Sequence, residues 1–383
     1  MTESVFWILI FLIFYTYLGY PLILWMLTIF FSKPVKKEDI TPLVSLIISA
    51  YNEEKVIERK IRNCLDLDYP KDRLEIIIAS DCSSDKTDGI VTNYKDEGVK
   101  LVRLDSREGK TAVQNRAFEQ AIGEILVFSD ADSMYQKEAI RNIVKGFADQ
   151  SVGCVGGRFI YQKPKGGSFG EEKWLLGKFE QSLRQKESNV TTQIVVSGGF
   201  YAVRKSLYSA LEPDLVSDFG LPLKIIKRGF RVIYESSAIA YEETVPSMAD
   251  EFKRKVRTIG QGWSALFNSK FELTSLLNPF KYGLISFQLF SHKVLRWIAP
   301  IFLMSLLIIN AYTFHTDYFY KICMGIQIIF YILAVIGLIL RDAERKSKIF
   351  YLPYYFCAMN MAAVAGFWQF SLGRPKVKWN PRQ

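Results

Sequence analysis

Hydrophobic residues are concentrated at the two ends of the chain, and the middle has the mixed apolar and polar pattern of a soluble domain. Residues 5–31, 297–314 and 322–340 each form an apolar run without a charged side chain. A helix of about 20 apolar residues can cross the hydrocarbon core of a bilayer. The pattern therefore predicts a transmembrane anchor over 1–34, a soluble domain over 40–268 and a membrane region over 276–383.

Two further segments near the C-terminus have a weaker spanning pattern. Residues 278–296 mix aromatic residues with Lys, Arg and His, which predicts an amphipathic helix on the membrane surface. Residues 349–372 are long enough to cross, but a crossing would place the basic tail on the side opposite to the other basic segments. We expect an interfacial or re-entrant helix there, and a spanning helix remains the alternative.

The basic residues beside the first apolar run predict its orientation. Lys33, Lys36 and Lys37 follow the run, and no Lys or Arg precedes it. The positive-inside rule then places the N-terminus outside and the soluble domain in the cytoplasm, at the inner cell membrane. A cleaved signal peptide is the alternative, but the run is too long and no small-x-small cleavage site follows it.

Strand-like and helix-like patterns alternate between residues 42 and 161. The strand patterns are short runs rich in β-branched residues, and helical patterns lie between them. We expect strands at 43–49, 74–79, 99–103 and 125–129 and helices at 53–65, 86–94 and 110–122. A second set follows, with a strand at 197–203 and a helix at 221–228. Alternation of this kind predicts an α/β domain with a mainly parallel sheet.

Charge and cysteine usage exclude several classes of protein. The formal net charge is +10, but the basic residues lie largely beside apolar segments, so anionic lipid headgroups explain them better than a nucleic acid. The five cysteines have no C-x-x-C spacing, which argues against a zinc site and a disulfide framework.

Two carboxylates follow the fourth predicted strand. Asp130 and Asp132 come directly after a buried apolar run, and the carboxyl ends of parallel strands are where open α/β sheets bind ligands. Carboxylate oxygens at that edge suit Mg²⁺ or Mn²⁺ holding a diphosphate. A solvated turn or a helix cap is the alternative for this pair considered alone.

Four motifs occur in order along the soluble domain. They are Ile47-Ile-Ser-Ala-Tyr-Asn-Glu-Glu54, Ser80-Asp-Cys-Ser-Ser-Asp-Lys-Thr87, Arg107-Glu-Gly-Lys-Thr-Ala112 and Ser129-Asp-Ala-Asp132. Together they resemble the nucleotide-sugar half of a membrane-integrated family 2 glycosyltransferase, the group that contains hyaluronan, chitin and cellulose synthases. The resemblance covers roughly residues 42–265 and implies a GT-A fold, a Rossmann-like nucleotide-sugar domain.

The resemblance implies a nucleotide-diphospho-sugar donor, with UDP the favoured carrier, and it assigns residues to the nucleotide. Ala50, Tyr51 and Glu53 would border the base, and Asp81 would accept hydrogen bonds from the base or ribose. Lys110 would lie near the nucleotide. A turn or cap role for Asp81 and a solvated helix-start lysine remain open.

An ATPase is a poor alternative for the Gly109-Lys-Thr111 sequence. A Walker sequence would need glycine at position 104, where this chain has leucine.

The resemblance also implies the chemistry. Asp130 and Asp132 would hold the metal that bridges the diphosphate, and Asp218 falls where the family places its catalytic base. One base acting with the acceptor oxygen gives direct displacement, so the sugar's anomeric centre would invert. A plain helix cap is the alternative for Asp218.

The remaining site assignments lie near the membrane region. Arg254 and Arg257 could bind the diphosphate, with a basic patch near the bilayer as an equal alternative. Trp263 and Gln261 would bind the acceptor, although the family's Gln-x-x-Arg-Trp motif is degraded here. Trp379 and Arg382 resemble a gating loop in place and outline.

We therefore expect an inverting glycosyltransferase at the membrane that extends a glycan, in extracellular or capsular polysaccharide synthesis. A transferase that adds one sugar to a lipid-linked acceptor and a non-catalytic nucleotide-sugar sensor are the alternatives. Expected partners are membrane lipids, the donor, the glycan or lipid-linked acceptor, and a second copy of the chain or export proteins.

Overall fold

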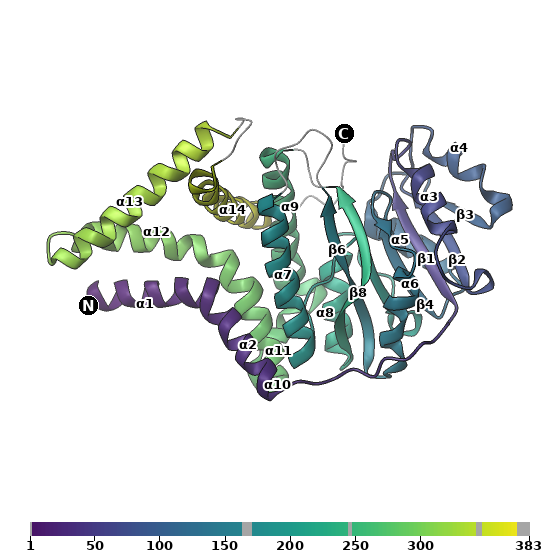
Figure 1. Cartoon of the computed structure of the whole chain (residues 1–383), viewed down its shortest axis with the longest axis horizontal. Coiled ribbons are helices and arrows are strands. Elements are labelled where there is room, and N and C mark those ends of the chain that lie inside the picture. Colours follow the sequence, from purple (N-terminus) through teal and green to yellow (C-terminus); the bar gives the residue numbers. More distant parts are fainter. Residues whose placement is uncertain (1, 163–170, 244–246, 342–346, 374–383) are drawn as a thin grey trace.

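The computed structural model describes residues 2–162, 171–243, 247–341 and 347–373. Figure 1 shows a sheet with flanking helices on one side and long helices extending away from it on the other. The helices α7 (Glu171–Val190) and α9 (Met248–Phe267) lie between these two parts. The predicted tail assignments Trp379 and Arg382 lie outside the described residues.

The sheet has eight strands in the order β3-β2-β1-β4-β7-β6-β8-β5. The strands β1 to β4 are parallel to their neighbours within that group, and β6 is parallel to β8, whereas β7 and β5 pair antiparallel. The mainly parallel α/β sheet is therefore confirmed. The strands are β1 (Val44–Ala50), β2 (Leu74–Ser80), β3 (Val99–Arg103), β4 (Ile125–Asp130), β5 (Met134–Tyr135), β6 (Val152–Gln162), β7 (Phe200–Arg204) and β8 (Arg231–Glu243).

The central strands are apolar on both faces because helices cover both. All of β1 is buried, and successive residues belong to different cores: Ile47 packs with residues of one face and Ile48 with residues of the other. This alternation follows from the period of two in a strand. The helices of the domain are α3 (Ile57–Leu65), α4 (Thr87–Thr92), α5 (Lys110–Gln120), α6 (Ala139–Val144), α7, α8 (Ser217–Lys227) and α9.

Short 3₁₀ turns connect several of these elements. They lie at Lys71–Arg73, Lys95–Glu97, Lys145–Ala148, Lys205–Leu207, Ser269–Phe271 and Thr274–Leu277.

One helix start differs from the sequence prediction in a way that affects the site. The helix expected at 221–228 begins at Ser217, so Asp218 lies inside its first turn rather than before it. The sequence pattern did not reveal the first turn of this helix, because Ser217, Asp218 and Gly220 are not typical of an apolar helix face. The apolar run that predicts the helix begins only at Leu221.

Four helices of the described chain are long and apolar enough to cross a membrane: Thr2–Phe30, Leu284–Thr313, Tyr318–Ile339 and Lys348–Ser371. They indicate a membrane protein. The first consists of α1 (Thr2–Phe14), a π-helical turn (Tyr15–Gly19) and α2 (Tyr20–Phe30). After α10 (Pro279–Tyr282), the second consists of α11 (Leu284–Leu289), a π-helical turn (Phe290–Val294) and α12 (Leu295–Thr313). The others are α13 (Tyr318–Ile339) and α14 (Lys348–Ser371).

The separate surface helix predicted at 278–296 is wrong for most of its length. Residues from Leu284 onward continue through the π-helical turn into α12 as one helix. The polar residues that suggested a solvated face are instead turned inward: His292 is buried between two glutamates of α7. His292 lies within the π-helical turn Phe290–Val294, and such turns inside α-helices are frequent at functional sites.

The helix α14 is unbroken and packs against the sheet domain. Its Gly366 lies beside α9 so closely that an added Cβ would be 2.9 Å from the Val256 carbonyl oxygen and 3.0 Å from the Gly260 nitrogen. In Figure 1, α14 is seen nearly end-on, whereas α12 and α13 run across the view. An interfacial position for α14 therefore stays a prediction that this packing favours, and a re-entrant break does not fit the continuous helix.

The contact between Gly123 and β1 provides a test of the fold. An added Cβ at Gly123 would lie 2.3 Å from the Ser45 backbone nitrogen, whereas at Gly89 it would meet nothing within 4 Å. We predict that Gly123→Ala destabilises the chain by about 1–3 kcal/mol because β1 must shift. Each kcal/mol of lost stability should lower the melting temperature by roughly 2–4 °C.

The control is Gly89→Ala, in the exposed helix α4, where alanine should be neutral or stabilising. Thermal unfolding of the detergent-solubilised full chain measures both, and equal melting temperatures for the two variants would contradict the close contact.

Candidate functional site

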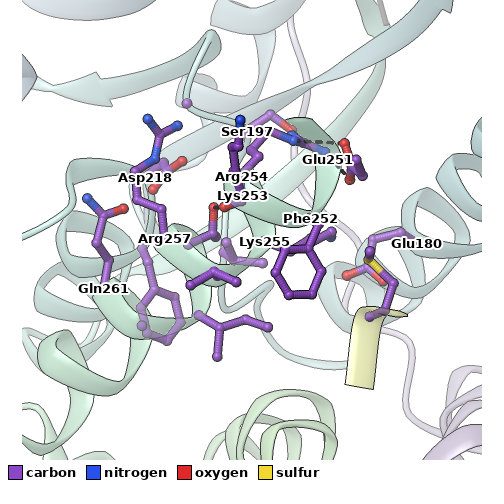
Figure 2. A pocket seen from close by; sticks show the side chains of 18 of the residues that line it. Glu180, Ser197, Asp218, Glu251, Phe252, Lys253, Arg254, Lys255, Arg257 and Gln261 are labelled. Atoms are coloured by element: carbon purple, nitrogen blue, oxygen red, sulfur yellow. Dashed lines mark hydrogen bonds and ion pairs between the residues drawn. The ribbon is translucent and has the colours of Figure 1, made fainter. Parts of the chain in front are cut away.

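A cavity of about 2260 Å³ lies between the carboxyl edge of the sheet, the helices α7, α8 and α9, and the membrane helices. Figure 2 shows part of its lining, with residues of α9 in the middle and Asp218 toward one end. The cavity brings together most of the residues that the sequence singled out. Those that line it are Tyr51, Glu53, Lys110, Asp130, Asp132, Asp218, Arg254, Arg257 and Gln261.

The two acids of the fourth strand both face this cavity. Asp130 is the last residue of β4 and Asp132 follows in the turn. Lys110, the first residue of α5, forms an ion pair with Asp130, and its ammonium also donates to the Gly198 carbonyl oxygen at 3.0 Å. The lysine therefore joins β4, α5 and the loop before β7.

A divalent ion fits the acids of this edge. Mg²⁺ and Mn²⁺ need few protein carboxylates, because substrate phosphates and water complete their coordination. Among the described residues no group of three or more His, Cys, Asp or Glu side chains gathers for a metal, so Asp130 and Asp132 would share the ion with a bound diphosphate. The buried Ser133 hydroxyl has no hydrogen-bond partner among the residues that the structure describes, and it lies beside the same turn.

Asp218 is held near the other acids by glycine. A Cβ added to Gly198 would lie 2.8 Å from Asp218 Oδ2 and 3.3 Å from Lys110 Nζ, and a Cβ at Gly199 would lie 3.2 Å from Asp130 Oδ2. The Val196 amide donates to the Asp218 carbonyl oxygen at 3.1 Å and ties this loop to the start of α8. A glycine pair is thus needed where the loop passes between the carboxylates.

The surroundings of Asp218 change its proton affinity. Burial raises the pKa of Asp218, and the Asp130 charge acts in the same direction, while Lys110, Arg184 and Arg257 oppose the rise. The position in the first turn of α8 also favours a carboxylate. Figure 2 shows Arg257 and Asp218 at the same end of the pocket. The net effect is an acid with more affinity for a proton than an ordinary surface aspartate.

Tyr51 and Arg107 form the wall of the cavity where the nucleotide is expected. The Arg107 guanidinium lies 3.8 Å from the Tyr51 ring centroid, and both residues line the cavity. We did not assign Arg107 from the sequence, although it opens the Arg107-Glu-Gly-Lys motif. Ala50 is buried at the end of β1 and supports this wall from behind.

Asp81 has a different role from the predicted contact with base or ribose. Its side chain is fully buried, and it accepts hydrogen bonds from the Glu108 amide at 2.8 Å and the Gly109 amide at 3.0 Å. The carboxylate therefore holds the loop that carries Arg107 and Lys110. The direct contact with the nucleotide does not fit this arrangement.

Two further residues that the sequence singled out lie on α9. The Arg254 guanidinium pairs with Glu251 at 2.7 Å, so part of its charge is already balanced. The Trp263 ring is 7% exposed and packs against Phe267, Trp297, Phe367 and Phe370. Stacking of an acceptor sugar on Trp263 therefore does not fit the structure.

The degraded motif before Trp263 has a packing explanation. A Cβ at Gly262, where arginine is usual in the resembling family, would lie 2.7 Å from the Trp297 ring. A longer side chain cannot be placed there while Trp297 and Trp263 pack together.

The sequence analysis also missed Lys60. It lies on the buried face of α3 with Ile57, Ile61 and Cys64, and its ammonium donates to the Ser133 carbonyl oxygen below the Asp130–Asp132 turn. The ring centroid of Tyr135 lies 3.8 Å from this ammonium. A lysine within the apolar stripe of a helix was the available signal, because such a cation needs a specific partner.

Comparison with known proteins supports the resemblance. Residues 45–211 match the family description "Glycosyl transferase family 2". These residues form a family 2 glycosyltransferase domain. The glycosyltransferase domain is 30% identical over 223 residues to "Probable glycosyltransferase YdaM" of Bacillus subtilis, covering 53% of this chain and 51% of that protein.

Other relatives are more distant. "Poly-beta-1,6-N-acetyl-D-glucosamine synthase" of Staphylococcus aureus is 25% identical over 254 residues, covering 63% of this chain and 59% of that protein. The chain spans about half the length of several curated relatives that it matches.

A solved structure shares the whole architecture. The mannosyltransferase PcManGT from Pyrobaculum calidifontis, in complex with GDP-Man and Mn²⁺, has a TM-score of 0.73 at 21% identity, covering 97% of this chain and 99% of that one. At this identity the likeness shows the fold alone.

The contact at Gly198 provides a test of the site. We predict that Gly198→Ala lowers glycosyl transfer on the order of tenfold to a hundredfold, since displacing a reacting group by about 1 Å can cost that much. The added methyl group would displace the Asp218 carboxylate or the Lys110 ammonium. The rate of nucleotide release by purified protein measures the effect.

The surface variant Gly89→Ala is the control for the Gly198→Ala change and should retain parental activity. An active Gly198→Ala enzyme with unchanged rate would show that the loop does not set the position of Asp218.

Proposed function

We propose that the chain is an inverting glycosyltransferase that moves a sugar from a nucleotide-diphospho-sugar to an acceptor at the membrane. The observation that carries this proposal is one cavity whose lining includes Asp130, Asp132, Lys110 and Asp218 at the sheet edge and residues of α12, α13 and α14 at the other end. The donor and a membrane-borne acceptor could thus meet within it.

The displacement needs one base and one stabilised leaving group. The acceptor oxygen forms a bond to the anomeric carbon while the bond from that carbon to the diphosphate oxygen breaks, and its electron pair leaves with the nucleoside diphosphate. The Asp218 carboxylate takes the proton of an acceptor hydroxyl. Attack opposite to the leaving group inverts the anomeric centre.

Charge on the departing diphosphate would be balanced at the sheet edge, beside Asp218. Asp130 and Asp132 would hold a divalent ion, which neutralises the leaving group when bound. Lys110 and Arg107 contribute fixed positive charge at the same edge, and Lys60 and Asp81 keep the two loops in position from below.

The acceptor can be a growing polysaccharide or a single lipid-linked acceptor. The likeness to the poly-N-acetylglucosamine synthase supports the polymer. The cavity favours the lipid-linked acceptor, because its far end is lined by apolar residues such as Leu303, Phe330 and Leu352. Sizing the product made from labelled donor separates the two: a ladder of long chains indicates the synthase, and one added sugar indicates the transferase.

The role of Asp218 is tested by replacing its carboxylate. We predict that Asp218→Asn lowers transfer by about 10²–10⁴-fold, which is the usual contribution of a general base. Donor binding should change little. Nucleotide release by the purified full chain with UDP-, GDP- and TDP-sugars measures turnover and identifies the donor, and equilibrium binding of the preferred donor measures affinity.

Asp68→Asn is the control, because Asp68 pairs with Arg141 at the surface and is not among the residues that line the cavity. It should keep the parental rate, and the assignment of Asp218 fails if Asp218→Asn keeps that rate as well.

The raised pKa of Asp218 predicts the acid side of the pH profile. The base must be ionised, so kcat/KM should fall as the pH drops through a value above the ordinary aspartate range of about 4. Arg257 opposes the rise, so Arg257→Gln should move the acid limb to higher pH. A profile that does not respond to Arg257→Gln would argue against Asp218 as the titrating group.

A further inference from the structure

The part of the cavity between Asp218 and the membrane helices is lined by cations. Arg184 comes from α7, Lys255 from α9, Lys293 from the π-helical turn and Arg296 from α12. These residues are distinct from Lys110 and Arg107 at the donor side. Positive charge from four elements around one space is suited to an anion.

Two of these cations, Lys255 and Lys293, have acidic neighbours but form no ion pair with them within the described chain. No hydrogen bond or ion pair is present for the Lys255 or Lys293 ammonium in residues 2–162, 171–243, 247–341 and 347–373, although both side chains are half-buried. Burial lowers the pKa of Lys255, since a cation is less stable away from water. A bound anion would offset the free-energy cost of burying these charged ammonium groups.

The acids that act on the two lysines already have partners. Glu251, four residues before Lys255, pairs with Arg254 at 2.7 Å. Glu180 accepts from His292 Nε2 at 2.7 Å and from Arg296 at 3.0 Å, so both of its oxygens have partners. Glu187 contacts His292 Nδ1 at 2.6 Å and the Tyr20 hydroxyl at 2.5 Å. This network joins α2, α7 and the π-helical turn and fixes the wall on which Lys293 lies.

Beyond the lysines the lining becomes apolar. Leu303 of α12, Phe330 of α13, and Leu352, Phe356 and Met359 of α14 lie along the end of the cavity next to the membrane helices. Figure 2 shows Asp218, Arg257 and Lys255 near the α9 helix, with Glu180 on the opposite side of the pocket. From the sheet edge to the membrane, the cavity thus presents the Asp218 acid, then cations together with the paired glutamates Glu180 and Glu251, then hydrocarbon.

We propose that Lys255 and Lys293 bind the phosphate of a membrane lipid whose hydrocarbon chain lies against α12, α13 and α14. This proposal rests on the proposed transfer reaction and names its acceptor class, a lipid phosphate. The order of the lining matches such a molecule: the attacking oxygen lies near Asp218, the phosphate between the lysines, and the chain in the apolar end.

Two kinds of lipid phosphate have this chemistry, and they differ in whether a proton must be transferred during the reaction. In a phosphate monoester of an isoprenoid alcohol, an ionised phosphate oxygen attacks the anomeric carbon and no proton has to move. In phosphatidylglycerol, a headgroup hydroxyl attacks and its proton goes to Asp218. In both cases the nucleoside diphosphate leaves with the electron pair of the broken bond.

The test measures lipid binding by the full chain, separately from turnover. The probes are a fluorescent isoprenoid monophosphate and phosphatidylglycerol in nanodiscs, with neutral diacylglycerol as the uncharged comparison, all at one salt concentration because screening changes such contacts. We expect the parent chain to prefer the lipid phosphates. We expect the double variant Lys255→Gln/Lys293→Gln to bind them at least tenfold more weakly, with diacylglycerol binding unchanged.

Matched variants keep the result interpretable. Lys281→Gln removes an exposed lysine of α10 that is not among the residues lining the cavity, and this variant should bind lipid like the parent. The conservative pair Lys255→Arg/Lys293→Arg should retain most of the affinity. Donor binding by the double variant should stay at the parental level, which shows that the domain is folded.

The outcomes separate the two proposals. Equal binding of lipid phosphate by the parent and the double variant would overturn this proposal, as would a parent that does not prefer lipid phosphate over diacylglycerol. If lysine-dependent lipid binding is observed but no donor supports transfer, the proposed function fails and the lipid site remains. If Asp218→Asn still transfers sugar to the isoprenoid monophosphate, the acceptor is the monoester and the base role of Asp218 fails while the lipid site remains. If Asp218→Asn loses transfer to phosphatidylglycerol, the acceptor is the headgroup hydroxyl and the base role holds.

Discussion

The Lys110 ammonium, placed between the Asp130 carboxylate and the Gly198 carbonyl oxygen, is the contact on which the site depends. Asp130, Asp132 and Asp218 carry like charges around one cavity, and their repulsion would separate them without a cation between them. The glycine pair at 198–199 makes the arrangement possible, because a side chain at either position would collide with a carboxylate or with the Ser133 hydroxyl. A bound diphosphate and metal ion would then add to a charge distribution that is already in place.

The sequence predicted the sheet well because its signal is local. Buried parallel strands such as Val44–Ala50 and Ile125–Asp130 are continuous apolar runs, and the acids after them must lie at one edge. The sequence could not predict which polar side chains reach the cavity. Asp81 and Asp130 both follow strands, yet Asp81 turns to bind backbone amides of the next loop. That choice depends on contacts between segments far apart in the chain, and Lys60 below the Asp130 turn is a second example.

The membrane region was harder to predict for a related reason. Apolar runs reveal helices that can span, but polar residues within a run have two explanations, a solvated face or an internal partner. For His292 the second explanation is correct, because Glu180 and Glu187 of α7 reach it from a segment more than 100 positions earlier. The same ambiguity applied to Trp263. An exposed tryptophan that stacks on a sugar and a buried tryptophan in an aromatic cluster look alike in the sequence, and here the tryptophan is buried against Phe267 and Trp297. Periodicity alone cannot distinguish such pairs.

The packing of α14 on α9 connects the chemistry to the membrane. Gly260 and Gly366 allow the two backbones to approach each other directly, so a helix that lines the apolar end of the cavity is fixed to the helix that carries Arg257 and Lys255. The depth of an acceptor lipid in the bilayer would then determine how far its polar end reaches toward Asp218. If a flexible linker joined the catalytic residues to the membrane helices, acceptors at many depths in the bilayer could react. The close contact of α9 with α14 instead fixes the distance between the apolar end of the cavity and Asp218. Selection for the acceptor can therefore arise from the geometry of the helix pair as well as from the charges around the phosphate.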